Sequence, residues 1–200
     1  MNDSDYEIIE RSILWRGYFR IDGYRLRHRL FDGGWSGEIR REVFERGHAA
    51  AVLPYDPERD AVVLIEQFRV GAVAAGMPAW QEEIIAGIID DGETAGDVAR
   101  REAQEEASCT VRDLVPICRY LASPGGSSES VQLYCGRTDS RGIGGVHGLE
   151  GEHEDIRVET VPFGEARDRL LAGRFGNAPA IIALQWLILN RDDLRRRWSA

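Results

Sequence analysis

The chain has 200 residues, of which 43% are apolar and 30% are charged, and it carries a formal net charge of −9. This length and apolar content suffice for one compact domain, or for one domain with a small appendage. Because the negative charge repels a phosphate backbone and no basic stripe offsets it, we expect no nucleic-acid partner.

The first 45 residues predict a small strand-rich unit. Residues 24–31 and 38–44 alternate or are rich in β-branched and aromatic side chains, and the run Asp32-Gly33-Gly34 lies between them, which indicates a hairpin. Residues 1–45 carry many charges and little apolar surface. We therefore expect them to form a unit separate from the main domain, residues 46–200, and too small to be stable alone.

The main domain is expected to begin with core strands and to continue with a helix. Two apolar runs, 49–55 and 61–66, are separated by a cluster of turn-forming residues and predict two strands. After Gly92, small apolar residues recur at helical spacing among charged residues. This pattern predicts a helix that begins at Glu93 or Thr94.

The rest of the chain predicts further strands and helices around one long loop. The expected strands are 111–120, 131–136 and 156–161, and the expected helices are 163–172 and from Pro179 to about 190. Residues 138–154 are rich in glycine and acidic residues and break the periodicity, so we expect an irregular functional loop there. The basic residues beyond 190 alternate with acidic ones, which is typical of a solvated helix end.

The cysteines and the hydropathy pattern indicate a cytoplasmic protein without a membrane partner. Cys109, Cys118 and Cys135 are odd in number and lack Cys-x-x-Cys spacing, which argues against a disulfide framework and a zinc site. The acidic N-terminus has no apolar signal-peptide core. The longest apolar stretch, 178–189, is too short to span a bilayer and predicts a buried helix.

Three carboxylates on the helix expected after Gly92 carry the chemical signal. On a helix, Glu102, Glu105 and Glu106 share about one turn, and like charges at this spacing cost a few tenths of a kcal/mol, roughly 0.2–0.5. Their oxygens suit a hard divalent cation such as magnesium or manganese. A solvated acidic face is the ordinary alternative for a glutamate-rich helix. Gly87 and Gly92 favour the metal site, because glycine permits the close backbone approach that such a site needs.

The segment that contains these carboxylates resembles the Nudix box. The residues in register with that motif are Gly87, Glu93, Arg101, Glu102, Ala103, Glu105, Glu106 and Cys109. At an average usage of about 5–7% per residue type, the six fixed matches arise by chance in about one of 10⁵ chains or fewer. Ser108 stands where the box has glycine. A left-handed torsion there costs serine on the order of 1 kcal/mol.

The resemblance implies a fold, an activity and an assembly. The implied fold is α/β, an α/β/α sandwich with a mixed sheet, preceded by a small N-terminal antiparallel β unit. Nearly the whole chain is similar to the bacterial ADP-ribose pyrophosphatases, and Pro124, about fifteen residues past the box, is a mark of that subfamily. Those enzymes imply magnesium-dependent hydrolysis of ADP-ribose to AMP and ribose 5-phosphate. They also imply a domain-swapped homodimer that exchanges residues 1–45.

The same resemblance assigns roles to single residues. The implied metal ligands are the backbone carbonyl of Ala86 and the side chains of Glu102, Glu106 and Glu154, with Glu105 nearby. The implied general base is Glu152, which a mobile glycine-rich lid, 139–151, brings to the attacking water. The implied substrate contacts are Tyr18, Phe19, Arg41, Glu42, Arg46, Arg69, Ile88, Ser123, Pro124, Gly125 and Glu129.

Two other functions stay open at this point. Hydrolysis of another nucleotide sugar, such as GDP-mannose, needs the same metal box with a different base pocket. A nucleotide-sensing domain that does not cleave its ligand has no need of every metal carboxylate, so the complete set disfavours it. Without the resemblance, an arginine on a strand is more often salt-bridged and an aromatic such as Tyr18 is more often core.

Overall fold

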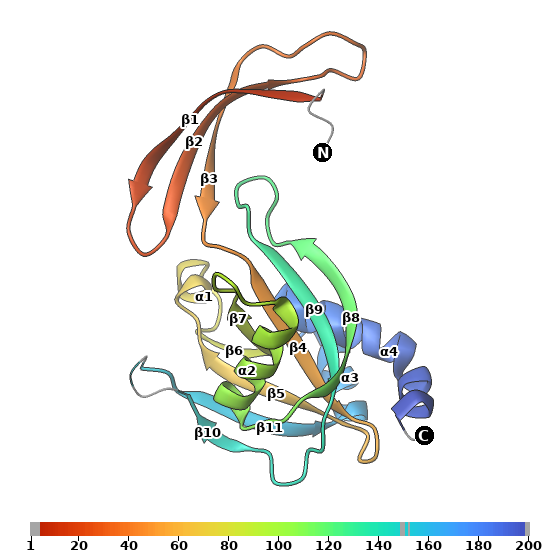
Figure 1. The fold of residues 1–200 in the computed structure, drawn as a ribbon. Coiled ribbons are helices and arrows are strands. Elements are labelled where there is room, and N and C mark those ends of the chain that lie inside the picture. The colour runs from red at the N-terminus through yellow and green to blue at the C-terminus, as the bar shows by residue number, and fades with distance from the viewer. Residues whose placement is uncertain (1–4, 149–150, 152, 199–200) are drawn as a thin grey trace. The chain divides into compact units, whose positions relative to one another are not determined.

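The computed structural model describes residues 5–148, 151 and 153–198 and divides the chain into two compact units (Figure 1). The first unit comprises the chain up to His48 together with Leu121–Ser130. The second unit comprises Ala49–Tyr120 and the chain from Val131 onward. Within the described residues, no helix is long and apolar enough to cross a membrane.

The first unit is a three-stranded antiparallel sheet. Its strands β1 (Tyr6–Arg16), β2 (Arg20–His28) and β3 (Ile39–Glu45) are ordered β1-β2-β3. The Leu121–Ser130 segment joins this unit through backbone hydrogen bonds, because the Phe44 amide donates to the Gly126 carbonyl at 2.8 Å. Residues 24–31 and 38–44 do contribute to paired strands, but the sheet also contains β1, which the sequence pattern did not predict.

The second unit is built on a mixed sheet whose centre is β4 (Ala49–Asp56), buried along its whole length. β4 pairs in parallel with β9 (Ser130–Arg137) and antiparallel with β5 (Ala61–Phe68) and β7 (Ile85–Ile88). The order along the sheet is β10-β11-β5-β4-β9-β8, with β6 paired to β5. The remaining strands are β6 (Trp80–Glu83), β8 (Arg112–Leu121), β10 (Gly145–His147) and β11 (Ile156–Pro162).

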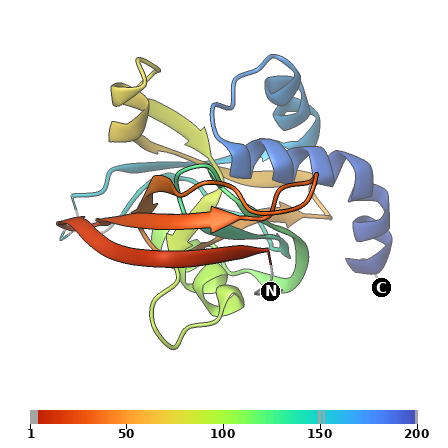
Figure 2. The ribbon, with the colours of Figure 1, turned by 90° about the horizontal axis from the view of Figure 1, so that it is seen from above.

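Helices cover both faces of this sheet, as Figure 2 shows for α2 on one side and α4 on the other. The small residues of α2 (Ala95–Ala107), such as Ala99 and Ala103, pack with Val63 and Ile65. On the opposite face, α3 (Phe163–Leu171) and α4 (Ala178–Trp198) cover a second cluster that includes Leu64. The α/β/α sandwich with a mixed sheet is thus confirmed. A short helix, α1 (Val70–Ala74), follows β5.

Two details of the second unit differ from expectation. The stretch 138–154 is not wholly irregular, because it contains β10, which pairs with β11 just after the stretch. The C-terminal helix runs to Trp198 rather than to about 190. Its last turns are held because Leu194 and Trp198 are buried, and the ring centroids of Trp198 and Tyr55 lie 6.3 Å apart. Its basic end is also anchored, because Arg191 donates to Asp60 at 2.6 Å.

Candidate active site

Helix α2 begins and ends with defined caps, which fix the direction of its carboxylates. The Thr94 hydroxyl accepts from the Asp97 amide at 3.2 Å, as an N-cap residue does. At the other end Ser108 adopts the left-handed conformation, with φ 48°. Serine therefore occupies the strained position that the sequence pattern predicted, at a cost of about 1 kcal/mol relative to glycine. Its hydroxyl lies 3.4 Å from Nδ1 of His147.

Glu106 is a nearly buried carboxylate that no cation contacts within the part of the chain that the structure describes. Glu106 is only 5% exposed, and its Oε2 accepts a hydrogen bond from the backbone amide of Ala86 at 3.3 Å. Burial, followed by the nearby charge of Glu102, raises the pKa of the Glu106 carboxyl to about 8. Keeping this group ionised at neutral pH therefore calls for a further positive charge.

Glu102 lies beside Glu106 and against the backbone of β7. Burial raises the pKa of the Glu102 carboxyl, although Arg101 opposes that shift. A Cβ atom added to Gly87 would overlap the Glu102 carboxylate. Only glycine leaves room for this approach, which is a physical reason for glycine at this position of the motif.

Arg101 neutralises the outer part of the same helix face. Its guanidinium donates to Glu93 at 3.0 Å, to Glu102 at 2.8 Å and to Glu105 at 2.9 Å. The bond to Glu93 ties the loop before α2 to the helix. Glu105 is 37% exposed and is paired with Arg101, whereas Glu106 is not. One arginine thus leaves the inner carboxylates with an excess of negative charge.

Arg69 and Glu154 extend this charged region from neighbouring elements. Arg69 follows β5 and pairs with Glu83 of β6 at 2.8 Å. Burial lowers the pKa of Arg69, but the hydrogen bonds and charge of Glu83 raise it more, and the charges of Glu106 and Glu154 add to that rise. Glu154 likewise raises the pKa values of Glu102 and Glu106, behind the larger effects of burial. The structure therefore brings the expected metal-site side chains of the second unit into one electrostatically coupled group.

Comparison with known proteins identifies the family of this arrangement. The model of the NUDIX domain matches residues 45–184. The chain belongs to the NUDIX family. The ADP-ribose pyrophosphatase of Escherichia coli (strain K12) is 50% identical to it, with 98% of this chain and 94% of that protein covered.

Other Nudix relatives broaden the comparison. The ADP-ribose pyrophosphatase of Haemophilus influenzae is 40% identical, with 99% of this chain and 93% of that protein covered. A GDP-mannose pyrophosphatase of Cronobacter sakazakii is 34% identical, with 92% and 95% covered. The crystal structure of an ADP compounds hydrolase shares the fold, with a TM-score of 0.71 and 21% identity over 96% of each chain.

The carboxylates of this Nudix domain do not form a closed cage. Among the residues that the structure describes, no three His, Cys, Asp or Glu side chains are grouped in a way that could hold a metal ion. Glu102 faces Arg101, and Glu106 faces the Ala86 amide. One half-buried and one buried carboxylate beside a backbone strand still fit a hard cation that keeps waters and substrate oxygens in its shell. Glu152, the expected base, lies outside the described residues.

The expected substrate contacts are divided between the two units of the Nudix chain. Arg69 and Ile88 lie in the second unit, where Ile88 is half-buried and pairs with Ala49. The first unit contains Tyr18, Phe19, Arg41, Glu42, Arg46, Ser123, Pro124, Gly125 and Glu129. The sequence pattern had not indicated that residues 123–129 fold together with the N-terminal strands.

Within the first unit, several of these side chains form one local group. Phe19 contacts Tyr18 and Phe44 edge to face, with ring centroids 4.8 Å and 5.1 Å apart. The Arg46 guanidinium lies 5.5 Å from the Phe19 ring and 3.5 Å from Glu129. Tyr18 is 88% exposed, so it is not a core aromatic in this chain.

The other expected contacts of the first unit lie in loop and strand positions. The Ser123 carbonyl accepts from the Gly126 and Ser127 amides at 3.1 Å and 2.8 Å, which closes a tight turn around the exposed Pro124 and Gly125. Arg41 and Glu42 are exposed on β3, and Arg41 Nη1 donates to the Arg40 carbonyl at 2.7 Å.

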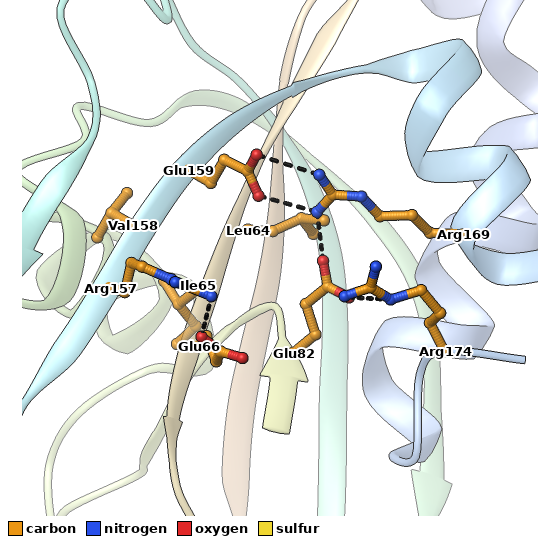
Figure 3. Close-up of a pocket in the computed structure, with 9 residues that line it drawn as sticks. All are labelled: Leu64, Ile65, Glu66, Glu82, Arg157, Val158, Glu159, Arg169 and Arg174. Atoms are coloured by element: carbon orange, nitrogen blue, oxygen red, sulfur yellow. Dashed lines mark hydrogen bonds and ion pairs between the residues drawn. The ribbon is translucent and has the colours of Figure 1, made fainter. Parts of the chain in front are cut away.

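A second charged cluster lies on the opposite face of the sheet and borders a cavity of about 420 Å³ (Figure 3). At its centre Arg169 of α3 bonds Glu82, Glu159 at 2.8 Å and Glu165 at 2.5 Å. Arg174 lies 3.5 Å from Glu82. Because each carboxylate here has an arginine partner, this cluster is a structural ion-pair network.

Glu83 is a residue of the site region that the sequence pattern did not indicate. It pairs with Arg69 across two strands, and its side chain is only 12% exposed. Alternation along β6 separates Glu83 from Glu82, which bonds Arg169 on the other face. Strand alternation could have suggested the split, but a four-residue strand is too short to be recognised from its pattern.

Proposed function

We propose that this chain is a magnesium-dependent ADP-ribose pyrophosphatase that hydrolyses ADP-ribose to AMP and ribose 5-phosphate. The observation that carries the proposal is the pair formed by the half-buried Glu102 and the buried Glu106, whose negative charge exceeds what Arg101 offsets. The choice of ADP-ribose as substrate rests on the E. coli and H. influenzae relatives named ADP-ribose pyrophosphatase, which align with nearly the whole chain.

The residues proposed to hold the metal are Glu102, Glu106, Glu154 and the Ala86 carbonyl, with Glu105 at the edge of the group. When bound, magnesium offsets the charge of the pyrophosphate and lowers the pKa of a water molecule. Glu102 and Glu106 supply hard oxygen ligands, and Gly87 lets Glu102 approach the β7 backbone. Arg101 orients Glu102 and Glu105 from the outer side. Manganese, with similar ligand preferences, is the alternative ion.

The proposed base is Glu152. A base that approaches the attacking water only after substrate has bound is best carried on a mobile segment, and Glu152 follows Gly151. Its role is to accept the proton of the water whose oxygen attacks phosphorus. Glu154 is the better candidate for a metal ligand, because it is half-buried and the Gly148 backbone packs against it.

The proposed substrate contacts combine an arginine at the pyrophosphate with aromatic and polar groups at the nucleoside. Arg69 has the charge and fork geometry to bind a phosphate oxygen, and Ile88 is a second proposed contact from this unit. The proposed nucleoside contacts are Tyr18, Phe19, Arg41, Glu42, Arg46, Ser123, Pro124, Gly125 and Glu129. The exposed ring of Tyr18 suits stacking on a purine.

We further propose a homodimer that exchanges the N-terminal units, residues 1–45, and works in the cytoplasm. Exposed apolar side chains on β1, namely Ile13, Leu14 and Trp15, support an interface there, because a monomer rarely exposes such a group. The three cysteines are free, which suits a reducing compartment. Light scattering after size exclusion should give twice the chain mass.

A second candidate substrate is GDP-mannose, which the 34% identical relative favours. Product analysis across ADP-ribose, GDP-mannose, NADH and diadenosine polyphosphates separates the two. We expect the highest kcat/KM for ADP-ribose, with AMP as a product. Preference for GDP-mannose by tenfold or more, about 1.4 kcal/mol in the transition state, would make the substrate assignment wrong.

A further inference from the structure

The pairing of Arg69 with Glu83 uses one defined edge of the guanidinium. Nε and Nη2 of Arg69 donate to Oε2 of Glu83 at 3.1 Å and 2.8 Å. Nη1 takes no part in these bonds. A guanidinium held side-on in this way keeps its outer N–H groups directed away from the carboxylate, so it can bind a second oxyanion at the same time.

Glu83 is itself held on rigid backbone. It lies in β6 opposite Ile65 of β5, and its Oε2 also accepts from the side-chain Nε2 of Gln67 at 3.4 Å. The backbone of Arg69 is fixed too, because its amide donates to the Ala79 carbonyl at 2.8 Å. The pair therefore fixes the side chain of Arg69 at the point where β5 ends and α1 begins.

Arg69 also has two competing anionic neighbours. Glu106 and Glu154 both attract it, as their effects on the pKa of Arg69 indicate. These are the carboxylates proposed as metal ligands. An arginine free to rotate would move toward them, because Glu106 is nearly buried and no cation of the described residues contacts it. In that position it would compete with the metal and withdraw from the substrate.

We propose that Glu83 is a positioning residue that holds Arg69 away from the metal carboxylates and directs it to the pyrophosphate of the substrate. This inference rests on the proposed function. The competing explanation is that the pair only closes the base of the 70–79 excursion, a role that the contact of Phe68 with Trp80 at 6.2 Å already serves. The two explanations differ in what they predict for ligand binding and for metal binding.

The test compares Glu83→Gln, Arg69→Gln and the double variant. Glutamine keeps the shape of Glu83 but loses its charge and one acceptor. The KM for ADP-ribose and the Kd of α,β-methylene ADP-ribose should each rise about tenfold in Glu83→Gln, the scale of one charged hydrogen bond, with kcat within about threefold of wild type. The double variant should bind no worse than Arg69→Gln alone.

Metal affinity provides the second readout. Titration with manganese, followed by electron paramagnetic resonance, should show several-fold weaker binding in Glu83→Gln. Removing the misplaced arginine should restore it, so the double variant should bind manganese as Arg69→Gln does. A residue that only closes a loop predicts no such restoration.

Glu82→Gln is the matched control, because Glu82 is the adjacent residue of β6 and bonds Arg169 on the other face. It should lower Tm and leave KM and manganese affinity unchanged. The inference is overturned if Glu83→Gln keeps wild-type KM and manganese affinity, or if the effects of the two single variants add. A wild-type protein that binds the analogue without cleaving ADP-ribose contradicts the proposed function alone, and the analogue still measures the coupling. A wild-type protein that binds neither the analogue nor ADP-ribose contradicts both the proposed function and this inference.

Discussion

Two carboxylate clusters lie on opposite faces of the same sheet, and they differ in how their charge is balanced. Arg169 lowers the pKa of Glu159 on the α3 side, mainly through its hydrogen bonds. On the α2 side, burial and Glu102 raise the pKa of Glu106 to about 8. The same residue type is thus stabilised as an anion on one face and destabilised as an anion on the other.

We infer from this difference that the α3 cluster serves stability and that the α2 cluster serves the proposed chemistry. Glu82 is nearly buried, and two arginines of the α3 side, Arg169 and Arg174, pair with it. Arg101 contacts Glu93, Glu102 and Glu105, yet among the residues described only the Ala86 backbone amide hydrogen-bonds Glu106. A buried anion without a nearby cation is costly, so its presence in a folded protein indicates that a bound cation offsets the charge.

The largest effect is expected on the α2 side, from Glu106→Gln. The amide cannot serve as an anionic metal ligand, so kcat should fall by about 10³ or more. Because a repulsive neighbour of Glu102 is removed, Tm in metal-free buffer should stay the same or rise. Steady-state kinetics and thermal unfolding measure the two quantities.

Asp97→Asn is the control for this variant, since it makes the corresponding change at an exposed position of α2. It should leave kcat unchanged. If Glu106→Gln unfolds but keeps its specific activity, the α2 cluster is structural, like the α3 cluster.

Glu152→Gln should lower kcat by about 10²–10⁴, the scale for loss of a general base, with little change in magnesium affinity. Glu154→Gln should instead raise the magnesium concentration needed for half-maximal activity. Titrating activity with magnesium in both variants separates base from ligand. Near-normal kcat of Glu152→Gln at saturating magnesium would exclude Glu152 as the base.

Arg169→Met should affect stability and leave chemistry unchanged. Methionine fills part of the space but removes the charged hydrogen bond of Glu82, which is nearly buried and keeps Arg174 at 3.5 Å, so the change should cost about 1–3 kcal/mol of unfolding free energy. Urea unfolding measures the loss, and kcat should remain within about twofold of wild type. A large fall in kcat without a loss of stability would mean that the two faces are not separate in function.

The smallest effect concerns the cap of α2. Ser108→Gly relieves a left-handed serine and should stabilise the fold by up to about 1 kcal/mol, less any contribution from the hydrogen bond to His147. Ser108→Ala removes the same hydrogen bond and keeps the Cβ, so the difference between the two variants isolates the strain. Equal stability of the two would show that Ser108 is not strained.

The parts of the fold that could be predicted are those whose pattern is local. The core strand around Ala49–Tyr55 is an unbroken apolar run, and α2 repeats small apolar residues at helical spacing. β1 could not be predicted, because all of its residues are exposed and none marks a buried face. The attachment of 121–130 to the N-terminal strands depends on backbone hydrogen bonds to Phe44, which leave no local pattern.

The site follows the same division. The spacing of Glu102 and Glu106 predicted a shared helix face, and both are held there with little exposure. The contact between Gly87 and the Glu102 carboxylate could be seen only in the structure, because it depends on the position of β7 beside α2. Glu83 was missed, because its partner Arg69 lies fourteen positions away, just after the neighbouring strand β5.

The most direct test of a metal site at Glu106 is unfolding as a function of pH with and without magnesium. Because the folded pKa of Glu106, about 8, lies above its ordinary value of 4.5, the folded state binds this proton more tightly. The stability that the bound proton gives the fold is complete below pH 4.5 and is lost as pH rises through 8. In metal-free buffer the free energy of unfolding should fall by about 2–4 kcal/mol over this range. Magnesium should restore that loss, raising Tm more at pH 8 than at pH 5, and Glu106→Gln should abolish both responses. An unchanged wild-type Tm on adding magnesium at pH 8, or the same pH response in Glu106→Gln, would contradict the metal site.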